Sequence, residues 1–145
     1  MLKIQDGRII IAEASVKLPN GLYLSNYNDK RKKLMFKDEN INFHIELTQL
    51  CGELPEFADT RNSVLLQKGF IIKDNTEITV NGLRGYYIIY RITEKECYEA
   101  WLKNDIERYE TYLKLQICAY TKKTNITDVL QQKTVNDFFC NIRAE

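Results

Sequence analysis

The sequence lacks an excess of charge of either sign. Its 145 residues include 21 Lys and Arg and 20 Asp and Glu, which leaves a formal net charge of +1 at pH 7. Binding to a nucleic-acid backbone needs many positive charges that neutralise phosphates, so this balance argues against a nucleic-acid partner. Hydrophobic residues make up 44% of the chain, which excludes a disordered polypeptide.

Long hydrophobic runs are also missing. The apolar stretch at residues 9–12 is too short for a secretory signal peptide or for a helix that spans a membrane. We therefore expect a cytoplasmic protein that does not insert into membranes.

Residues that could hold a metal ion are few and widely spaced. His44 is the only histidine, and the four cysteines, Cys51, Cys97, Cys118 and Cys140, form no Cys-x-x-Cys pair. This spacing does not match a zinc site, so we expect no metal and no cofactor. In a reducing compartment, we expect the cysteines to be buried thiols that pack as small hydrophobic side chains.

A single histidine limits the catalytic chemistry. His44 and Glu46 share one face of a predicted strand and are candidates for a general base and its orienting carboxylate. A surface histidine that pairs with a neighbouring strand explains the same pattern, and we favour it. Gly82 and Gly85 form no nucleotide-binding loop because they lie in a predicted hairpin and open no helix. We therefore predict that the protein is not an enzyme.

Alternation of apolar and polar residues is the dominant pattern, and it is clearest at residues 41–48 and 112–120. In the first segment, the apolar set is Ile41, Phe43, Ile45 and Leu47. A period of two is typical of a β-strand with one face on a core. Slippage by one residue would expose the apolar set, so the register is well specified.

Turn residues separate the other predicted strands. Pro19 and Gly21 lie in an expected turn between strands at 8–18 and 22–27, and a short strand is expected at 34–36.

Asn81 and Gly82 favour a type I′ hairpin between 76–80 and 86–92, and we assign Gly85 to the same turn.

Two segments favour helices. Pro55 opens a predicted helix at 55–68 that ends at Gly69. Near the C-terminus, an apolar stripe with helical spacing is formed by Val135, Phe138, Phe139 and Ile142.

Thr134 and Asp137 resemble a capping box at the start of this second helix. Residues 94–109 fit either a helix or a strand, and the pattern alone leaves both open. The combined elements predict an α+β fold, with an antiparallel sheet of about six to eight strands sandwiched by helices. The C-terminal helix is expected to pack on that sheet.

Five segments together resemble the PsbP-like superfamily, which includes an extrinsic protein of photosynthetic oxygen evolution, a Ran-binding import factor and small bacterial chaperone-like domains. They are Ser15–Gly21, Phe43–Leu47, Lys68–Ile72, Ile78–Tyr86 and Phe138–Arg143. The resemblance implies one PsbP-like α+β domain over residues 1–145, an antiparallel sheet between helical layers and a strand at 95–103. It assigns no residue to binding, because the matching positions are structural, and fold likeness alone does not define function.

A run of positive charge occurs at Lys30, Arg31, Lys32 and Lys33. Such a run can bind an anionic partner. A solvated turn between two strands also explains it, and we favour this second interpretation.

Tyrosine is the most unusual component, with nine in the chain. Tyr112, Lys114, Gln116 and Tyr120 share one face of a strand, and Tyr and Trp are the preferred residues of protein interfaces. The competing interpretation places this face beneath the helix at 55–68.

We therefore predict a non-catalytic module that binds a protein or peptide partner through this face, with His44 and Glu46 as further contacts. A chaperone-like or immunity-like role fits such a module. The alternative is a small-molecule or lipid-binding domain with a pocket between the sheet and the helix at 55–68.

Overall fold

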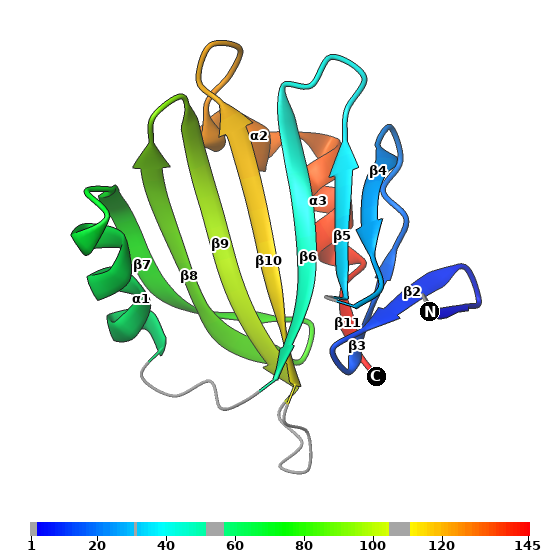
Figure 1. Cartoon of the computed structure of the whole chain (residues 1–145). Helices are drawn as coiled ribbons and strands as arrows, with labels where there is room; N and C mark the ends of the chain where they lie inside the picture. Colours follow the sequence, from blue (N-terminus) through cyan, green and yellow to red (C-terminus); the bar gives the residue numbers. More distant parts are fainter. Residues whose placement is uncertain (1–2, 31, 52–56, 105–110) are drawn as a thin grey trace.

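Two antiparallel β-sheets and three short helices make up the described part of the protein (Figure 1). The computed structural model describes residues 3–30, 32–51, 57–104 and 111–145. The larger sheet has seven strands in the order β4-β5-β6-β10-β9-β8-β7. These are β4 (Tyr23–Asn28), β5 (Lys33–Lys37), β6 (Phe43–Cys51), β7 (Ile71–Val80), β8 (Leu83–Ile92), β9 (Lys95–Asn104) and β10 (Thr111–Tyr120).

The smaller sheet joins the N-terminal segment to the end of the chain. Its four strands, in the order β1-β2-β3-β11, are β1 (Lys3–Gln5), β2 (Arg8–Ile11), β3 (Ala14–Lys17) and β11 (Arg143–Ala144). The single strand predicted at 8–18 is therefore wrong. Ala12 and Glu13, with φ of 52° and 58°, form the turn of a β2–β3 hairpin, and neither residue type signals a turn in a sequence.

The predicted turn at Pro19 and Gly21 is confirmed, with Gly21 at φ 80°. It connects β3 to β4 and so links the two sheets, whereas the sequence suggested two neighbouring strands of one sheet. Asn104 strengthens this junction, because its side-chain amide donates hydrogen bonds to the carbonyl groups of Glu13 and Glu145 at 3.2 and 3.0 Å.

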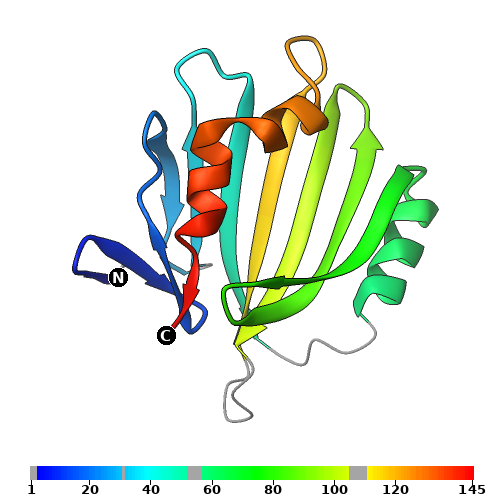
Figure 2. The ribbon, with the colours of Figure 1, turned by 180° about the vertical axis from the view of Figure 1, so that it is seen from behind.

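Alternation at β6 and β10 is confirmed. The two strands pair without a register shift from Phe43 opposite Ala119 to Cys51 opposite Thr111. Their apolar residues enter the main core, on the side of the sheet that α2 (Ile126–Gln131) and α3 (Lys133–Cys140) cover (Figure 2). Ile41 is the exception, since it lies before β6 with φ 51° and is exposed.

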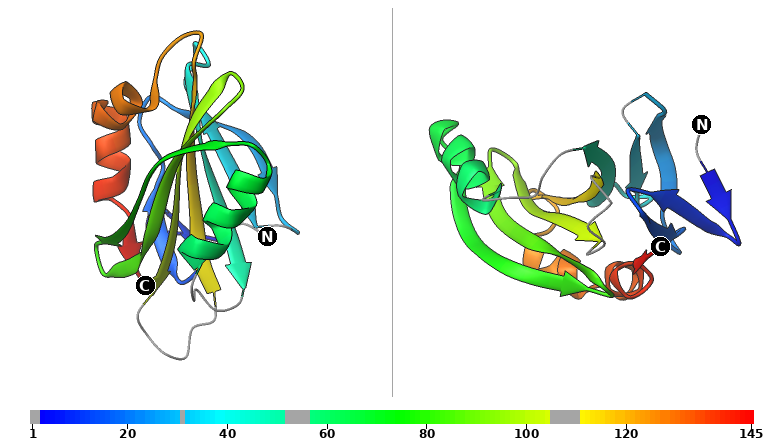
Figure 3. Two further views of the ribbon diagram at one scale, coloured as in Figure 1. Left: turned by 90° about the vertical axis from the view of Figure 1, so that its left-hand side faces the viewer. Right: turned by 90° about the horizontal axis from the view of Figure 1, so that it is seen from below.

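The predicted α+β sandwich is wrong, because the described structure is mostly antiparallel β in two sheets. α1 (Phe57–Gln67), α2 and α3 have 11, 6 and 8 residues, and helices this short cannot form full layers over a seven-stranded sheet. α1 lies on the face opposite to α2 and α3, at the β7–β8 end (Figure 3).

The helix ends agree only in part with the predictions. α1 is followed by Gly69 at φ 79°, as expected, while Pro55 lies outside the described residues. The C-terminal stripe is confirmed, with Val135 and Phe138 buried. The capping box is wrong, because α3 begins after Gln132 and Thr134 already lies within the helix. The missed α2 accounts for this shift.

The structure decides the first part of the open segment at 94–109, which forms β9, while residues 105–109 lie outside the described residues. The β7–β8 hairpin is also confirmed, with φ of 48° at Asn81 and 89° at Gly82. Gly85 corrects the prediction, since it lies inside β8 opposite Leu102 and not in the turn. A Cβ atom there would lie 1.6 Å from the carbonyl oxygen of Trp101, so the backbones approach too closely for any side chain.

Gly85→Ala should therefore destabilise the protein by about 3 kcal/mol or more, the upper end of the cost of overpacking. Urea denaturation at neutral pH measures this change. Gly7→Ala is the matched control, because Gly7 has a positive φ of 74° but nothing within 4 Å of a new Cβ atom. It should cost only about 1 kcal/mol. Equal decreases in the free energy of unfolding of the two variants would contradict the close approach at Gly85.

Candidate functional site

The face of the larger sheet that carries α1 is rich in polar and aromatic side chains, and we call it the polar face. The six predicted binding residues all lie on it, Tyr112, Lys114, Gln116 and Tyr120 on β10 and His44 and Glu46 on the adjacent β6. Gln116 pairs with Glu46, so the two strands place these residues side by side. In Figure 1, no helix of the described chain covers β9, β10, β6 or β5 on this face.

α1 covers the other end of the polar face. An apolar cluster forms there from Leu65, Ile88, Tyr90, Cys97 and Cys118, with Phe70, Ile72 and Ile92 packed against it. Among the described residues, Leu65 and its neighbours therefore pack directly between α1 and the sheet, where the alternative function requires a pocket. The prediction of buried cysteines holds for Cys97 and Cys118 but is wrong for Cys51 and Cys140, which are exposed.

A fully buried carboxylate lies between the covered and the open parts of the polar face. Glu99 on β9 is 0% exposed, and Arg61 of α1 donates to both of its oxygens at 2.8 and 3.0 Å. The Trp101 indole N–H donates to Oε2 at 2.9 Å, and the Tyr90 hydroxyl to Oε1 at 3.3 Å. Lys114 Nζ lies 3.7 Å from Oε1. Four groups thus share one buried negative charge.

These partners determine the ionisation of Glu99. Burial alone would raise the pKa of its carboxyl group, because a charged group loses its hydration. The hydrogen bonds from Arg61 and the positive charges of Lys114 and Arg61 outweigh burial, so the pKa lies below its ordinary value. Glu99 is therefore a carboxylate at neutral pH and anchors α1 to the sheet.

Removing one partner of this ion pair should be costly. Arg61→Ala leaves a buried charge without its main partner and should lower the free energy of unfolding by about 3–5 kcal/mol. In the Glu99→Gln background the same substitution should cost much less, because the charge is gone. Urea denaturation of wild type, Arg61→Ala, Glu99→Gln and the double variant measures the coupling free energy between the two side chains.

Lys122→Ala provides the control. Lys122 pairs with Glu94 at 3.3 Å, and both side chains are largely exposed. An exposed pair contributes about 0–1 kcal/mol. If Arg61→Ala cost no more than Lys122→Ala, Glu99 would not anchor the helix.

Aromatic rings continue the site onto its open part. Trp101 stacks on Tyr112 with ring centroids 5.3 Å apart, and Lys114 Nζ lies 5.5 Å from the centroid of the Trp101 ring. Trp101 is buried, whereas Tyr112 is partly exposed. The Gln116 amide donates to the Tyr90 hydroxyl at 2.7 Å and so connects the predicted residues to the Glu99 cluster.

His44 and Glu46, the candidates for a general base and its orienting carboxylate, each contact a different residue. Nδ1 of His44 shares a hydrogen bond of 2.9 Å with the Tyr120 hydroxyl, and Glu46 pairs with Lys33 Nζ at 3.1 Å. The prediction of a surface histidine is wrong, because His44 is only 6% exposed. In the described part of the chain, no three His, Cys, Asp or Glu side chains gather in a way that could hold a metal ion.

Burial has a clear effect on His44. It lowers the pKa of the imidazole to about 4, an effect that Glu46 opposes and that Lys95 and Lys37 increase. His44 is therefore neutral at pH 7. A neutral ring has one donor and one acceptor nitrogen, which suits its hydrogen bond with Tyr120.

This shift predicts a pH dependence of stability. The unfolded chain binds a proton at His44 near pH 6.5 and the folded chain only near pH 4, so stability should fall as the pH decreases between these values. The loss should reach about 3 kcal/mol. Chemical denaturation of wild type and His44→Gln at pH 7, 5.5 and 4 tests this prediction. Relative to His44→Gln, wild type should lose free energy of unfolding as the pH decreases. If the free energies of unfolding of the two proteins changed in parallel with pH, this would contradict the buried neutral histidine.

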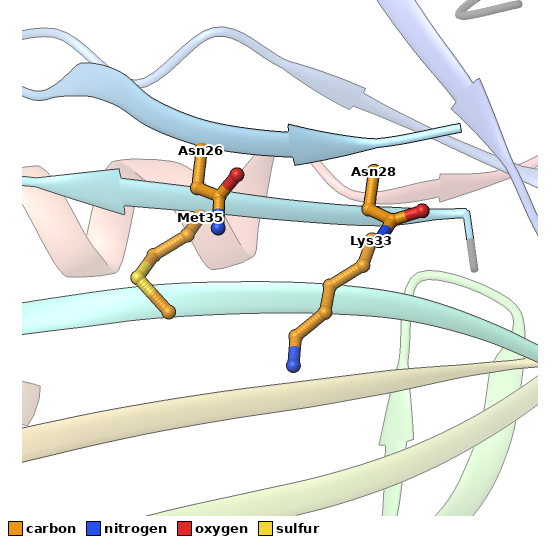
Figure 4. A pocket seen from close by; sticks show the side chains of 4 residues that line it. All are labelled: Asn26, Asn28, Lys33 and Met35. Atoms are coloured by element: carbon orange, nitrogen blue, oxygen red, sulfur yellow. The ribbon is translucent and has the colours of Figure 1, made fainter. Parts of the chain in front are cut away.

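A shallow hollow lies beside the site at the β4 edge of the sheet. Asn26, Asn28, Lys33 and Met35 line its volume of about 140 Å³, and the last two extend toward β6 (Figure 4). Most of the predicted basic run is close by. Lys32 is exposed and pairs with Asp29 at 3.5 Å, as expected for a solvated turn, whereas Lys33 reaches across to Glu46. Arg31 lies outside the described residues.

Local sequence patterns did not indicate the roles of Glu99 and Arg61 or the stacking of Trp101 on Tyr112. The sequence signal for Glu99 is its position between Tyr98 and Ala100. In a strand, this alternation places the carboxylate in the middle of the strand, on the face opposite to the two apolar residues. That signal stayed hidden because residues 94–109 also fit a helix. The contact with Arg61 joins segments 38 residues apart, and no local pattern predicts it.

Comparisons with known proteins identify a similar fold without a family. No family model matches the sequence, and no curated protein matches it. A crystal structure of a protein from Bacteroides thetaiotaomicron VPI-5482 superimposes with a TM-score of 0.54 at 7% identity, over 97% of this chain and 49% of that one. The chain thus spans about half the length of its neighbour, and at this identity the likeness concerns the fold alone.

The resemblance to the PsbP-like superfamily stays a prediction.

None of the described helices has the length and apolarity needed to cross a lipid bilayer.

Proposed function

We propose that this protein is a non-catalytic module that binds a protein or peptide partner through the open part of the polar face. The carrying observation is that β6 and β10 place the six predicted residues side by side on a face that the described helices leave uncovered. A chaperone-like or immunity-like role is consistent with such a module.

Rigid aromatic side chains support this proposal. Tyr112 is held by its stacking on Trp101, and Tyr120 by its hydrogen bond with His44. A side chain that is already ordered loses little conformational entropy on binding, so more of the contact energy contributes to affinity. Tyrosine also offers both an apolar ring and a hydroxyl to a partner.

Charge on the same face indicates the chemistry of the partner. Lys95 Nζ lies 5.6 Å from the centroid of the Tyr120 ring, and Lys37 pairs with His44 across the strands. Glu46 and Glu99 are already engaged by Lys33 and Arg61. Within the described ranges, no carboxylate forms an ion pair with Lys37 or Lys95. An acidic or carboxylate-bearing segment of a partner therefore suits this region best.

The alternative, a small-molecule or lipid site between the sheet and α1, lacks a supporting observation. Leu65 of α1 is fully buried against the sheet, and the apolar cluster around it occupies that space.

Affinity purification with variants of the polar face tests the proposal. Wild type, Tyr112→Ala/Tyr120→Ala and Ile4→Ala/Leu18→Ala serve as baits in cell extract, with quantitative mass spectrometry of the retained proteins. Ile4 on β1 and Leu18 directly after β3 are exposed, lie outside the larger sheet and provide the control for a loss of exposed apolar surface. We expect at least one protein that wild type and the control retain and that the polar-face variant loses by about tenfold or more.

Thr48→Tyr tests the same surface in case Tyr112→Ala/Tyr120→Ala does not fold. Thr48 lies on β6 opposite Lys114, and a larger side chain there blocks the surface without removing one of the six residues. It should weaken the same interaction while the melting temperature stays close to that of wild type. Identical retained proteins for all baits would reject the proposed function.

A further inference from the structure

Two buried cysteines face each other across neighbouring strands. Cys97 on β9 and Cys118 on β10 are directly paired in the sheet register, and both are free thiols, 1% and 3% exposed. Their Sγ atoms lie 2.7 Å apart. This separation is shorter than a contact between two non-bonded sulfur atoms and longer than a disulfide bond of about 2.05 Å.

The backbone around the pair already has the geometry of a disulfide. Directly opposed residues in an antiparallel sheet have Cα atoms about 4.5 or 5.5 Å apart. A disulfide joins Cα atoms about 4.4–6.8 Å apart, so the bond needs no strand movement. The register on both sides of the pair continues without a shift, from Gln116 opposite Glu99 to Tyr120 opposite Lys95.

The same distance argues against a metal site at this pair. Two thiolates bound to one tetrahedral zinc ion, each with a Zn–S bond of ~2.3 Å, are held about 4 Å apart. Sulfur atoms in closer contact leave no room for an ion between them. The remaining chemistry of two adjoining thiols is oxidation to a disulfide.

We propose that Cys97 and Cys118 form a reversible cross-strand disulfide. The oxidant is a low-molecular-weight disulfide of the glutathione type. The thiolate of one cysteine attacks a sulfur of the oxidant, forms a mixed disulfide and releases one molecule of the small thiol. The second thiolate then attacks the protein sulfur of that mixed disulfide and releases the second small thiol. Both cysteine protons go to the two released thiols, and the protein loses two electrons in total.

The hydrogen bond between the two thiols shifts their pKa values in opposite directions. It lowers the pKa of the Cys97 thiol, and Lys95 acts in the same direction, although burial opposes both. The pKa of Cys118 is raised by the same hydrogen bond and by burial. The thiolate is the reactive form in this exchange.

Redox titration of the full chain tests this site. In a Cys51→Ser/Cys140→Ser variant, only the buried pair remains, because the two exposed cysteines are removed. The variant is equilibrated in mixtures of reduced and oxidised glutathione, alkylated under denaturing conditions and digested with trypsin. A bond between the peptides 96–103 and 115–122 reports the disulfide by mass spectrometry.

The same titration in concentrated urea provides the comparison. The folded sheet holds the two thiols together, so the equilibrium constant for bond formation should be at least about tenfold larger in the folded chain. Circular dichroism of the reduced variant verifies that it is folded. Equal or smaller constants in the folded chain, or complete alkylation of both cysteines at every ratio, would overturn the proposal.

Single substitutions complete the test. With Cys97→Ala or Cys118→Ala in the same background, the linked peptides must disappear. Alanine is chosen because it leaves no unpaired polar group in the apolar cluster around Leu65. Linked peptides that persist would place the bond elsewhere and reject this pair.

Discussion

Successive side chains of a β-strand point to opposite faces of its sheet, and β6, β10 and β9 follow this rule without interruption. From Phe43 to Cys51 and from Lys95 to Leu102, each residue faces its partner on β10 with no bulge. Most apolar members therefore reach the main core and most polar members reach the other face, where Trp101, Cys97 and Cys118 also lie. A shift by one residue in β9 would turn Glu99 into the main core, and a shift in β6 or β10 would turn core leucines to the other face. The register thus determines both the core and the candidate binding surface.

The ion pair between Arg61 and Glu99 explains how α1 is held on this sheet. The helix has no apolar stripe, and Leu66 is exposed while Leu65 is buried. Burial of Leu65 alone contributes only about 2 kcal/mol. The two hydrogen bonds from Arg61 to Glu99 add a directional contact that fixes the helix at one position on the sheet. Arg61 reaches Glu99 from α1 at the β7–β8 end of the sheet, so the described helices leave β10, β6 and β5 uncovered on the polar face.

Local patterns predicted much of this structure, and contacts between distant segments account for what they missed. Alternation gave the faces of β6 and β10, and Asn81 with Gly82 gave the β7–β8 hairpin. Ala12 and Glu13 adopt positive φ values that their residue types do not signal, so the small sheet was missed. The helical layers were overestimated because Pro55 and Gly69 indicate where a helix begins and ends but not how much of a sheet it covers. The pairing of β6 with β10, on which the grouping of His44 with Tyr120 depends, joins segments 76 residues apart.

Trp101 connects the covered and the open parts of the polar face. Its indole N–H donates to the buried carboxylate of Glu99, while its ring stacks on the partly exposed Tyr112. The orientation of the exposed ring therefore depends on a buried charge, and that charge depends on Arg61 of α1. Lys114 lies over the same indole and approaches the same carboxylate, so it is held from two sides. A surface supported in this way presents fixed rather than mobile side chains, which is the property that the proposed binding function requires.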